Sequence, residues 1–247
     1  MEINVTKTKY VNFDTRGFQF PQPLFYHELN CLGHCNCEII EQVSHFKYLG
    51  LVMDEKMTWK THITNLHNKI KFSIRKFYFL RNFCNEALMR SLYFALIQSR
   101  IQYGLVCWGS AFKYLIDRIR VTQNHFLRII LHKKRRESAF PLFIDLKILP
   151  IQHLFIYKVL RLFFIRSGNQ GTTNLYYTTR NMTHNMFRIP KVKKSIYRQS
   201  FSYIGPKYFN QIPTELRNCN QSKTFGQKLY SWLLSVENIA FFSSVLT

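Results

Sequence analysis

The sequence predicts an α+β fold that is mostly helical, with a small antiparallel sheet at the N-terminus, a helical bundle after it and a small C-terminal unit. The 247-residue chain is 47% hydrophobic and 16% aromatic, so it can bury a sizeable core. Apolar residues up to position 55 fall in short extended runs, whereas those after it recur at helical spacing. Basic residues are interleaved with apolar ones in the middle of the chain, which indicates that they lie on folded elements and not on a tail.

Three short runs in residues 1–55 predict the strands of the sheet. Lys7–Phe13 and Glu38–Val43 are extended in character, and residues 46–53 form an apolar-rich run that ends at a turn. We expect these runs to pair as an antiparallel sheet. Asp54, which follows the third run, suits a turn or the start of a helix.

Residues 56–167 predict a helical domain. Its first helix has an apolar stripe for a core beside a basic stripe that suits an anion. The apolar stripe consists of Ile63, Leu66, Ile70, Ile74 and Phe77, and the basic stripe of Lys60, His67, Lys71 and Arg75. Further helices are expected from the capping residue Asn85 to Ser99, from Lys113 to His132, and from Pro150 to Ser167.

The helix Lys113–His132 is predicted to point Leu115, Ile119, Phe126 and Ile130 inward and to end on four basic residues. Residues 168–183 are rich in Asn, Thr and Gly, which predicts a loop or linker. Residues 184–247 then form a small unit. Its expected features are turns at Gly205-Pro206 and Ile212-Pro213 and a short helix over Ser222–Leu234.

The charge of the chain is strongly positive, with a net charge of +22 and a pI of about 9.9. Residues 56–136 hold 17 bases and two acids, and residues 146–214 hold 11 bases and no acid. Such a surface attracts polyanions, so nucleic acid is the expected partner.

The residues themselves do not predict catalysis. Cys31, Cys35, Cys37 and His34 include ligands that zinc prefers, but their spacing is poor for a tetrahedral site, so we expect ordinary reduced cysteines and no metal. The aspartates Asp14, Asp54, Asp117 and Asp145 are isolated from one another in the sequence, and no glycine-rich phosphate loop is present. No small-molecule substrate is expected.

The sequence predicts neither a secretory signal nor a membrane span, because Lys158 and Arg161 interrupt the apolar run over residues 151–165. Irregular cysteine spacing favours a reducing compartment, the nucleus or the cytoplasm. One alternative is a basic peripheral membrane protein, for which the apolar helix over Phe155–Phe164 is the best argument.

The segment Phe46-Lys47-Tyr48-Leu49-Gly50, followed by Met53-Asp54, Trp59 and His62-Ile63, resembles a known pattern. It is similar to the Lys-Tyr-Leu-Gly … Asp … Trp … His-Ile stretch of reverse transcriptases from non-LTR retrotransposons, especially jockey-like elements. The resemblance continues in register over nearly the whole chain. It includes Asn4–Lys9, Tyr93, Tyr103-Gly104, Trp108-Gly109, Asn124–Leu131, and Gly205-Pro206 to Ile212-Pro213.

The resemblance implies the C-terminal part of such a polymerase, namely the last palm strands, the primer grip and a helical thumb. The family's catalytic Asp-Asp turn would then lie upstream of residue 1. By the same resemblance, Phe46–Gly50 belong to the hairpin that supports the primer terminus, Lys7 lies near the incoming triphosphate, and the helices of residues 57–136 are thumb-like.

A thumb holds a duplex by its backbone, which requires Lys and Arg side chains that contact phosphates. We therefore expect a reverse transcriptase region that binds RNA, DNA or their hybrid, with Mg²⁺ required only by a complete polymerase. The alternative within this family is an active polymerase completed by an upstream or separate palm. The expected phosphate-binding residues are Lys60, Lys71, Arg75, Arg118, Arg120, Arg128, Lys133, Lys134, Arg135 and Arg136.

Overall fold

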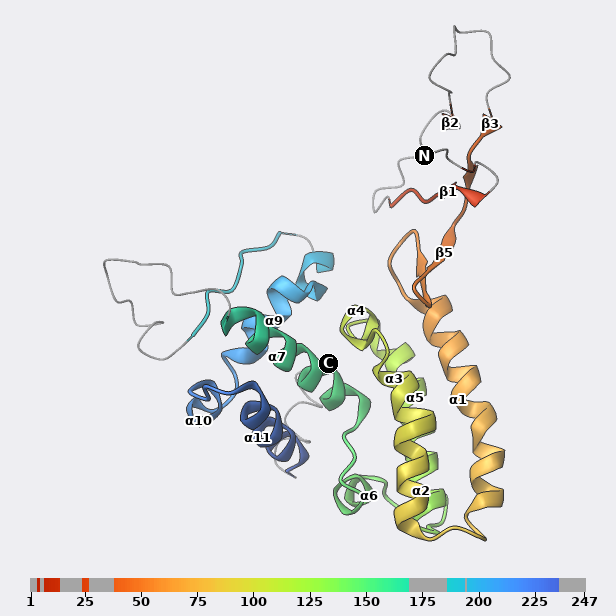
Figure 1. The fold of residues 1–247 in the computed structure, drawn as a ribbon, viewed down its shortest axis with the longest axis vertical. Coiled ribbons are helices and arrows are strands. Elements are labelled where there is room, and N and C mark those ends of the chain that lie inside the picture. The colour runs from red at the N-terminus through yellow and green to blue at the C-terminus, as the bar shows by residue number, and fades with distance from the viewer. Residues whose placement is uncertain are drawn as a thin grey trace, which may run out of the picture. The chain divides into compact units, whose positions relative to one another are not determined.

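A computed structural model describes residues 4, 7–13, 24–26, 38–168, 186–193 and 195–235. The chain divides into two compact units, Met1–Asn65 and Leu66–Thr247, and Figure 1 shows that strands belong to the first and helices dominate the second. The predicted mostly helical α+β fold, with antiparallel pairing near the N-terminus, is therefore confirmed. The predicted linker, apart from Gly168, and the cluster Cys31–Cys37 lie outside the described residues.

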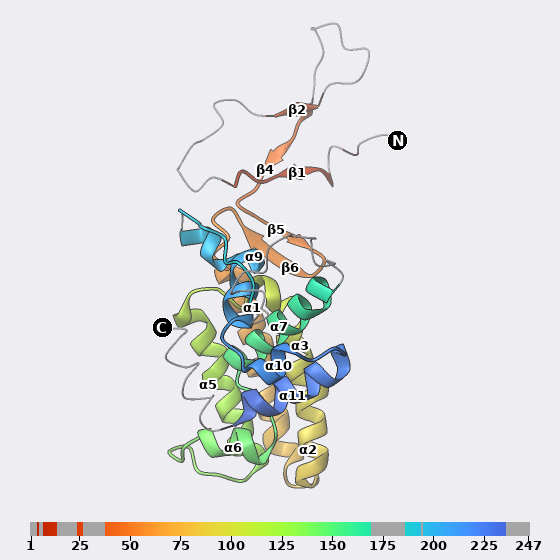
Figure 2. The same ribbon diagram turned by 90° about the vertical axis from the view of Figure 1, so that its left-hand side faces the viewer.

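The described strands form three separate two-stranded sheets instead of one three-stranded sheet. Two pairs, β2 with β3 and β5 with β6, are antiparallel, although β2 was not among the predicted strands. The predicted runs Lys7–Phe13 and Glu38–Val43 pair through β1 and β4, which lie beside each other in Figure 2, but this pair is parallel, so the prediction of antiparallel pairing between them is wrong. The strands are β1 (Lys9–Tyr10), β2 (Phe25–Tyr26), β3 (Glu38–Ile39), β4 (Glu41–Gln42), β5 (His45–Tyr48) and β6 (Leu51–Asp54).

The run over residues 46–53 is a hairpin and not one strand, which corrects the sequence prediction. The pair Tyr48↔Leu51 leaves a two-residue turn at Leu49 and Gly50, whose φ angles are 45° and 83°. Positive φ at both positions matches the right-handed twist of the two strands. Glycine adopts this backbone freely, whereas leucine there is strained, and this makes the turn hard to predict from sequence.

Asp54 connects the hairpin to helix α1 (Lys60–Leu80). Its Oδ2 accepts hydrogen bonds from Thr58 N at 2.9 Å and Thr58 Oγ1 at 2.8 Å, and its Oδ1 accepts one from Trp59 N at 2.8 Å. Burial raises the pKa of this carboxyl, but the hydrogen bonds outweigh burial and leave the pKa lowered. The predicted role of Asp54 at a helix start is confirmed.

The second unit opens with the rest of α1 and a long, nearly continuous helix. This comprises α2 (Glu86–Tyr93), a π-helical turn (Phe94–Gln98) and α3 (Ser99–Gln102), with α4 (Leu105–Trp108) after it. Asn85 caps α2 as predicted, since its side chain accepts a hydrogen bond from Leu88 N. The face that this helix buries consists of Met89, Tyr93, Ile97 and Ile101.

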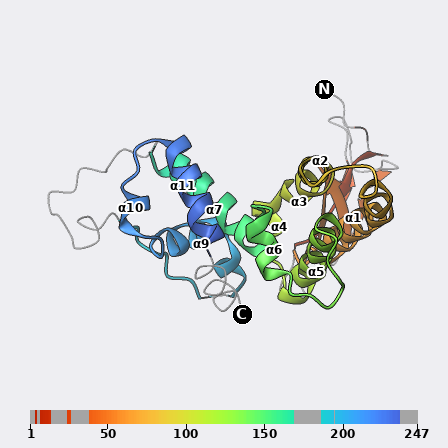
Figure 3. The same cartoon turned by 90° about the horizontal axis from the view of Figure 1, so that it is seen from below.

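Two long helices, α5 (Lys113–Ile130) and α7 (Ile151–Gly168), form the centre of the second unit, with α6 (Phe140–Asp145) between them in sequence. The predicted inward residues Leu115, Ile119, Phe126 and Ile130 are all buried. Helix α7 contacts α4, α5, α9 and α11, as Figures 1 and 3 illustrate.

These contacts explain why α7 is apolar on nearly all sides. Phe155, Ile156, Val159 and Leu160 are at most 2% exposed, so they belong to the core. The apolar character of residues 155–164, which favoured a peripheral membrane protein, is therefore explained by packing inside the second unit. None of the described helices is long and apolar enough to cross a membrane.

The C-terminal elements are a 3₁₀ turn (Ser195–Gln199), α9 (Phe201–Phe209), α10 (Thr214–Arg217) and α11 (Ser222–Leu234). Helix α11 and the turn at Ile212-Pro213 agree with the predictions, but Gly205-Pro206 lies inside α9 and not in a turn. A Cβ at Gly205 would lie 2.6 Å from Phe163 Cδ2. The glycine is therefore needed for close packing of α9 on α7.

Candidate nucleic-acid interface

The part of α1 in the second unit carries basic and aromatic side chains on its solvent-exposed side. Phe72 is 76% exposed and Phe79 is 65% exposed, while Phe77 on the opposite side packs edge-to-face on Phe126 of α5, with ring centroids 4.8 Å apart. Exposed bases surround the two exposed rings. We call this surface the α1 face and define it by Lys69, Lys71, Phe72, Arg75, Lys76 and Phe79.

The centre of the α1 face is hollowed. A shallow cavity of about 430 Å³ is lined by Asn68, Lys71, Phe72, Arg75 and Lys76. The Lys76 ammonium lies 6.0 Å from the centroid of the Phe72 ring, so cation and ring are adjacent. A cationic surface with an accessible ring suits a phosphate backbone and an unstacked base at the same place.

Helix α5 adds positive charge along the edge of the α1 face. His67 has a lowered pKa because of burial first, and then because of the nearby charges of Lys71 and Arg118. His125 has a lowered pKa for the same kinds of reason, namely burial and the charges of Arg128 and Arg135. Burial is the larger cause of both shifts; the smaller contribution from the neighbouring bases is the part that reflects positive charge along this edge, which would favour a bound anion.

The two helices are also linked by a hydrogen bond between Tyr78 Oη and His125 Nε2 at 2.9 Å. Arg81 lies over the Tyr78 ring, 4.9 Å from its centroid. This contact fixes the α5 edge against α1, so the bases on both helices share one scaffold.

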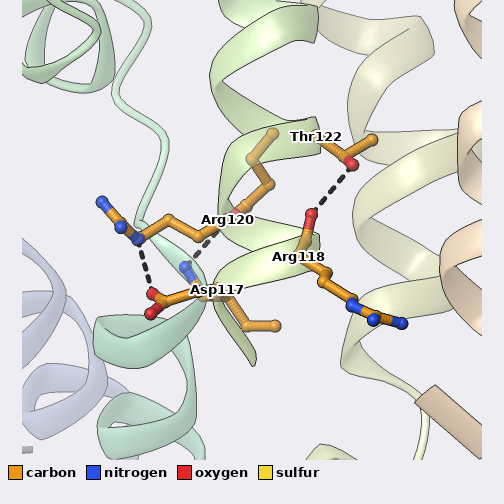
Figure 4. A network of polar contacts seen from close by, with 6 residues as sticks. Asp117, Arg118, Arg120 and Thr122 are labelled. Carbon is orange, nitrogen blue, oxygen red and sulfur yellow. Dashed lines mark hydrogen bonds and ion pairs between the residues drawn. The ribbon is translucent and has the colours of Figure 1, made fainter. Parts of the chain in front are cut away.

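The arginines of α5 differ in what they contact. The side chains of Arg118 and Arg120 leave α5 on opposite sides, as Figure 4 shows. Arg120 Nε donates to Asp117 Oδ1 at 2.9 Å, whereas Arg118 is exposed and, like Lys71, lowers the pKa of His67 on α1. Of these two predicted phosphate-binding arginines, Arg118 is the one whose charge acts on α1.

The basic residues after α5 lie in an exposed turn and not in the helix itself, which ends at Ile130. Glu137 is the acceptor in this turn. Its Oε1 accepts from Lys134 N at 2.7 Å, its Oε2 lies 3.8 Å from Lys133 Nζ, and its carbonyl accepts from Arg128 Nε at 3.0 Å. Arg135 and Arg136 are exposed in the same turn.

Three sequence-predicted sites belong to the first unit. Lys7 is exposed just before β1, and its backbone N–H donates to Asn4 Oδ1 at 3.2 Å. The hairpin tip presents Tyr48 and Leu49, which are 61% and 73% exposed. Lys60 is the exposed first residue of α1.

The carboxylates in the described part of the chain do not fit a two-metal site. Asp54 accepts hydrogen bonds from Thr58 and Trp59, and Asp117 is paired with Arg120. Within the described residues no three His, Cys, Asp or Glu side chains gather as metal ligands would. Nucleotidyl transfer needs carboxylates that hold two magnesium ions, so no catalytic step is assigned to these aspartates.

The sequence interpretation missed the aromatic half of the α1 face. Phe72, Phe79 and Phe83 are exposed, and Phe79 and Phe83 pack on each other with ring centroids 5.0 Å apart. These aromatic residues lie off the core stripe in the sequence. That pattern could have indicated a helix with one side packed on the core and the other side available for binding.

The α1 face is a basic helical surface with exposed aromatic rings. Comparison with known proteins shows what the chain is similar to. The probable RNA-directed DNA polymerase from transposon X-element of Drosophila melanogaster is 26% identical over 131 residues, which is 52% of this chain and 13% of that protein. The RNA-directed DNA polymerase from mobile element jockey of Drosophila melanogaster is 30% identical over 109 residues, which is 41% of this chain and 12% of that protein.

The polymerase from mobile element jockey of Drosophila funebris is 26% identical over 98 residues, which is 38% of this chain and 11% of that protein. These similarities confirm the resemblance seen in the motifs: the chain is similar to a region of the RNA-directed DNA polymerases of jockey-like, non-LTR elements. The matched region spans 13% or less of the length of each of these relatives. No family model and no solved structure matches the chain.

Several residues that carry the resemblance build the core of the second unit. Trp108 is fully buried, and its Nε1 donates to the carbonyl of Tyr103 at 2.9 Å. Gly104 has a φ of 60°, and a Cβ at Gly109 would lie 2.3 Å from a ring carbon of Phe155. These motif residues therefore maintain the helical scaffold that carries the α1 face.

Proposed function

We propose that this chain is the nucleic-acid-binding, thumb-like C-terminal region of a retrotransposon-derived reverse transcriptase, and that it does not polymerise alone. Its ligand is the backbone of RNA, DNA or an RNA–DNA hybrid, and its compartment is the nucleus or the cytoplasm. The family function is RNA-directed DNA synthesis, which needs Mg²⁺ held by carboxylates that the described residues do not bring together.

The observation that carries the proposal is the α1 face. Lys69, Lys71, Arg75 and Lys76 are all exposed around the Phe72 ring. Arg118 of α5 extends the positive potential beyond α1. Lys and Arg side chains that contact phosphates give strong binding with little sequence preference, which is what holding any template requires.

The test is a salt titration of binding to an RNA–DNA hybrid. The triple variant Lys71→Gln, Arg75→Gln, Lys76→Gln removes three charges from the α1 face. If each base neutralises one phosphate, the slope of log affinity against log salt becomes shallower by about 3, since each contact contributes about 0.9.

A matched triple variant controls for net charge. Lys191→Gln, Lys223→Gln, Lys228→Gln removes the same three charges from exposed positions outside the α1 face. We expect the control to change the slope much less. Equal slopes for the two variants would show that the α1 face has no special role, and a flat slope for the unmodified chain would refute backbone binding altogether.

The aromatic residues of the α1 face give a second, independent readout. Replacing Phe72 and Phe79 with alanine should weaken binding of single-stranded nucleic acid by about 1–3 kcal/mol for each stacked base, without changing the salt slope. Phe112→Ala, at an exposed phenylalanine before α5, is the control. A change in slope with no loss of affinity would argue against stacking.

A second candidate function is a polymerase completed by an upstream or separately made palm. It is favoured by the sheets of the first unit. Each described sheet has only two strands, and so small a sheet has marginal stability unless further strands, such as those of a palm, pair with it. The chain alone should give no primer extension with Mg²⁺ or Mn²⁺. Extension on adding a palm fragment, slowed by Lys7→Ala, would support this candidate.

A further inference from the structure

The second unit contains a cavity that is separate from the α1 face. It lies between the turn that precedes α5, the first half of α7, and the segment that leads into α9. Its volume is about 240 Å³. Ile116, Phe155 and Ile204 form an apolar floor, and all three are buried.

The charged groups around this cavity are all basic. Lys113, Arg198 and Lys207 line it from three different elements, and among the described residues its lining includes no acid. Lys113 and Arg198 are exposed, whereas Lys207 is half-buried. None of these three forms an ion pair with a carboxylate among the described residues.

Uncharged polar residues complete the wall. Ser110, Gln152 and Gln199 line the same cavity, so hydrogen-bond donors accompany the cations. Lys113 is also the first residue of α5, an 18-residue helix without a side-chain N-cap. The positive end of the helix dipole therefore adds to the charge of the three bases.

Gly109 allows the cavity to have this shape. A Cβ at Gly109 would lie 2.3 Å from Phe155 Cδ2, so the backbone of the turn rests directly on the floor. A larger residue would push the turn away from α7. The wall formed by Ser110 and Lys113 is thus held in position by close packing.

Size and charge select the ligand. The cavity is smaller than the roughly 300–1,000 Å³ of pockets that enclose a drug-sized molecule, so it fits a single small group. Three cations and a helix N-terminus complement a phosphate monoester, which carries about −1.5 to −2 at neutral pH, better than a singly charged diester.

We propose that this cavity, which we call the α5–α9 pocket, binds a phosphate group that carries close to two negative charges. The group is either the terminal phosphate of a nucleic-acid strand or free inorganic phosphate. Lys113, Arg198 and Lys207 supply the charge, and the amides and hydroxyl of the wall orient the phosphate oxygens. The pocket does not depend on the α1 face, because no residue is common to the two surfaces.

The test uses the full chain and two probes. Inorganic phosphate is added at constant ionic strength, with sodium chloride as the reference, and the midpoint of thermal unfolding is measured. Separately, affinity is measured for a single strand with a 5′-phosphate and for the same strand with a 5′-hydroxyl. Binding of phosphate to the folded chain raises the unfolding midpoint.

The variants are Lys207→Gln and Arg198→Gln, with Lys228→Gln on α11 as the control of equal charge. We expect phosphate to raise the unfolding midpoint of the unmodified chain and of the control, and to have no effect on the two pocket variants. The 5′-phosphate should improve affinity about tenfold, equivalent to about 1.4 kcal/mol, and this gain should disappear in the pocket variants.

The two probes separate the sources of the phosphate. A phosphate-dependent midpoint that requires Lys207 and Arg198, without a preference for the 5′-phosphorylated strand, supports the pocket with free phosphate as its ligand. If neither probe depends on Lys207 and Arg198, the proposal is overturned. Failure of the α1-face proposal would be distinguishable: its triple variant would then bind both strands no more weakly than its charge-matched control, while the response to inorganic phosphate would still require Lys207 and Arg198.

Discussion

Replacing Gln123 with leucine tests how the helical scaffold is held together. Gln123 on α5 is 1% exposed and makes contacts in two directions. Its Nε2 donates to Tyr93 Oη of α2 at 2.8 Å, and its Oε1 accepts from the Ile151 backbone N–H at 2.9 Å. Because Ile151 is the first residue of α7, one amide joins three helices.

The substitution Gln123→Leu keeps the volume of the side chain but leaves two buried polar groups without a partner. Tyr93 and Ile151 are both 0% exposed, so water does not replace the amide. Each unsatisfied group costs about 1–3 kcal/mol, and the apolar leucine recovers about 1–2 kcal/mol of this. We expect the free energy of unfolding to fall by about 3 kcal/mol.

Urea unfolding monitored by circular dichroism measures this loss. For a chain of this size, 1 kcal/mol corresponds to about 2–4 °C, so the thermal midpoint should fall by about 6–12 °C. Gln98→Leu is the matched control. Gln98 is 2% exposed, and its Oε1 has no hydrogen-bond partner within the described residues, so leucine there should be neutral or stabilising.

Equal stability of the Gln123→Leu and Gln98→Leu variants would refute the reasoning. It would mean that the hydrogen bonds of Gln123 add no measurable stability, because the two substitutions differ mainly in the hydrogen-bond partners that they remove.

Three further predictions follow from local geometry. Asp54→Ala should destabilise the chain by about 1–2 kcal/mol, because Thr58 and Trp59 lose the acceptor of the turn that leads into α1. Because the folded-state pKa of Asp54 is lowered, this contribution is present above the unfolded-state pKa of about 4 and is lost as the pH falls through the lower folded-state pKa, so the stabilities of the two proteins should converge in acid. Leu49→Asn should stabilise the hairpin by about 1 kcal/mol, since asparagine before Gly50 accepts a positive φ more readily than leucine, and a lower urea midpoint would contradict this. Gly109→Ala should cost about 1–3 kcal/mol because the added methyl group collides with Phe155, and an unchanged thermal midpoint would show that the turn can move away from α7.

The sequence alone determined the features that depend on neighbouring residues. The spacing of apolar residues predicted α1 and α5, and Pro150 predicted where α7 begins. Most of the predicted core stripe of α1 is buried, with Ile74 half-buried. The helix cap at Asn85 and the turn at Asp54 were recognised because capping and turn side chains act within a few residues of their own position. Short motifs also indicated the family, because each motif is a run of neighbouring residues that can be read directly along the chain.

The tertiary structure decided what depends on residues distant in sequence. The parallel pairing of β1 with β4 is set by which strand edges meet, and the need for glycine at position 205 comes from Phe163, which packs against it from α7. Gln123 has no local signature, since its partners belong to two other helices. The α5–α9 pocket likewise combines bases from segments more than 80 residues apart. Helical and turn preferences act over a few residues, whereas packing and charge clustering arise only when distant segments are brought together.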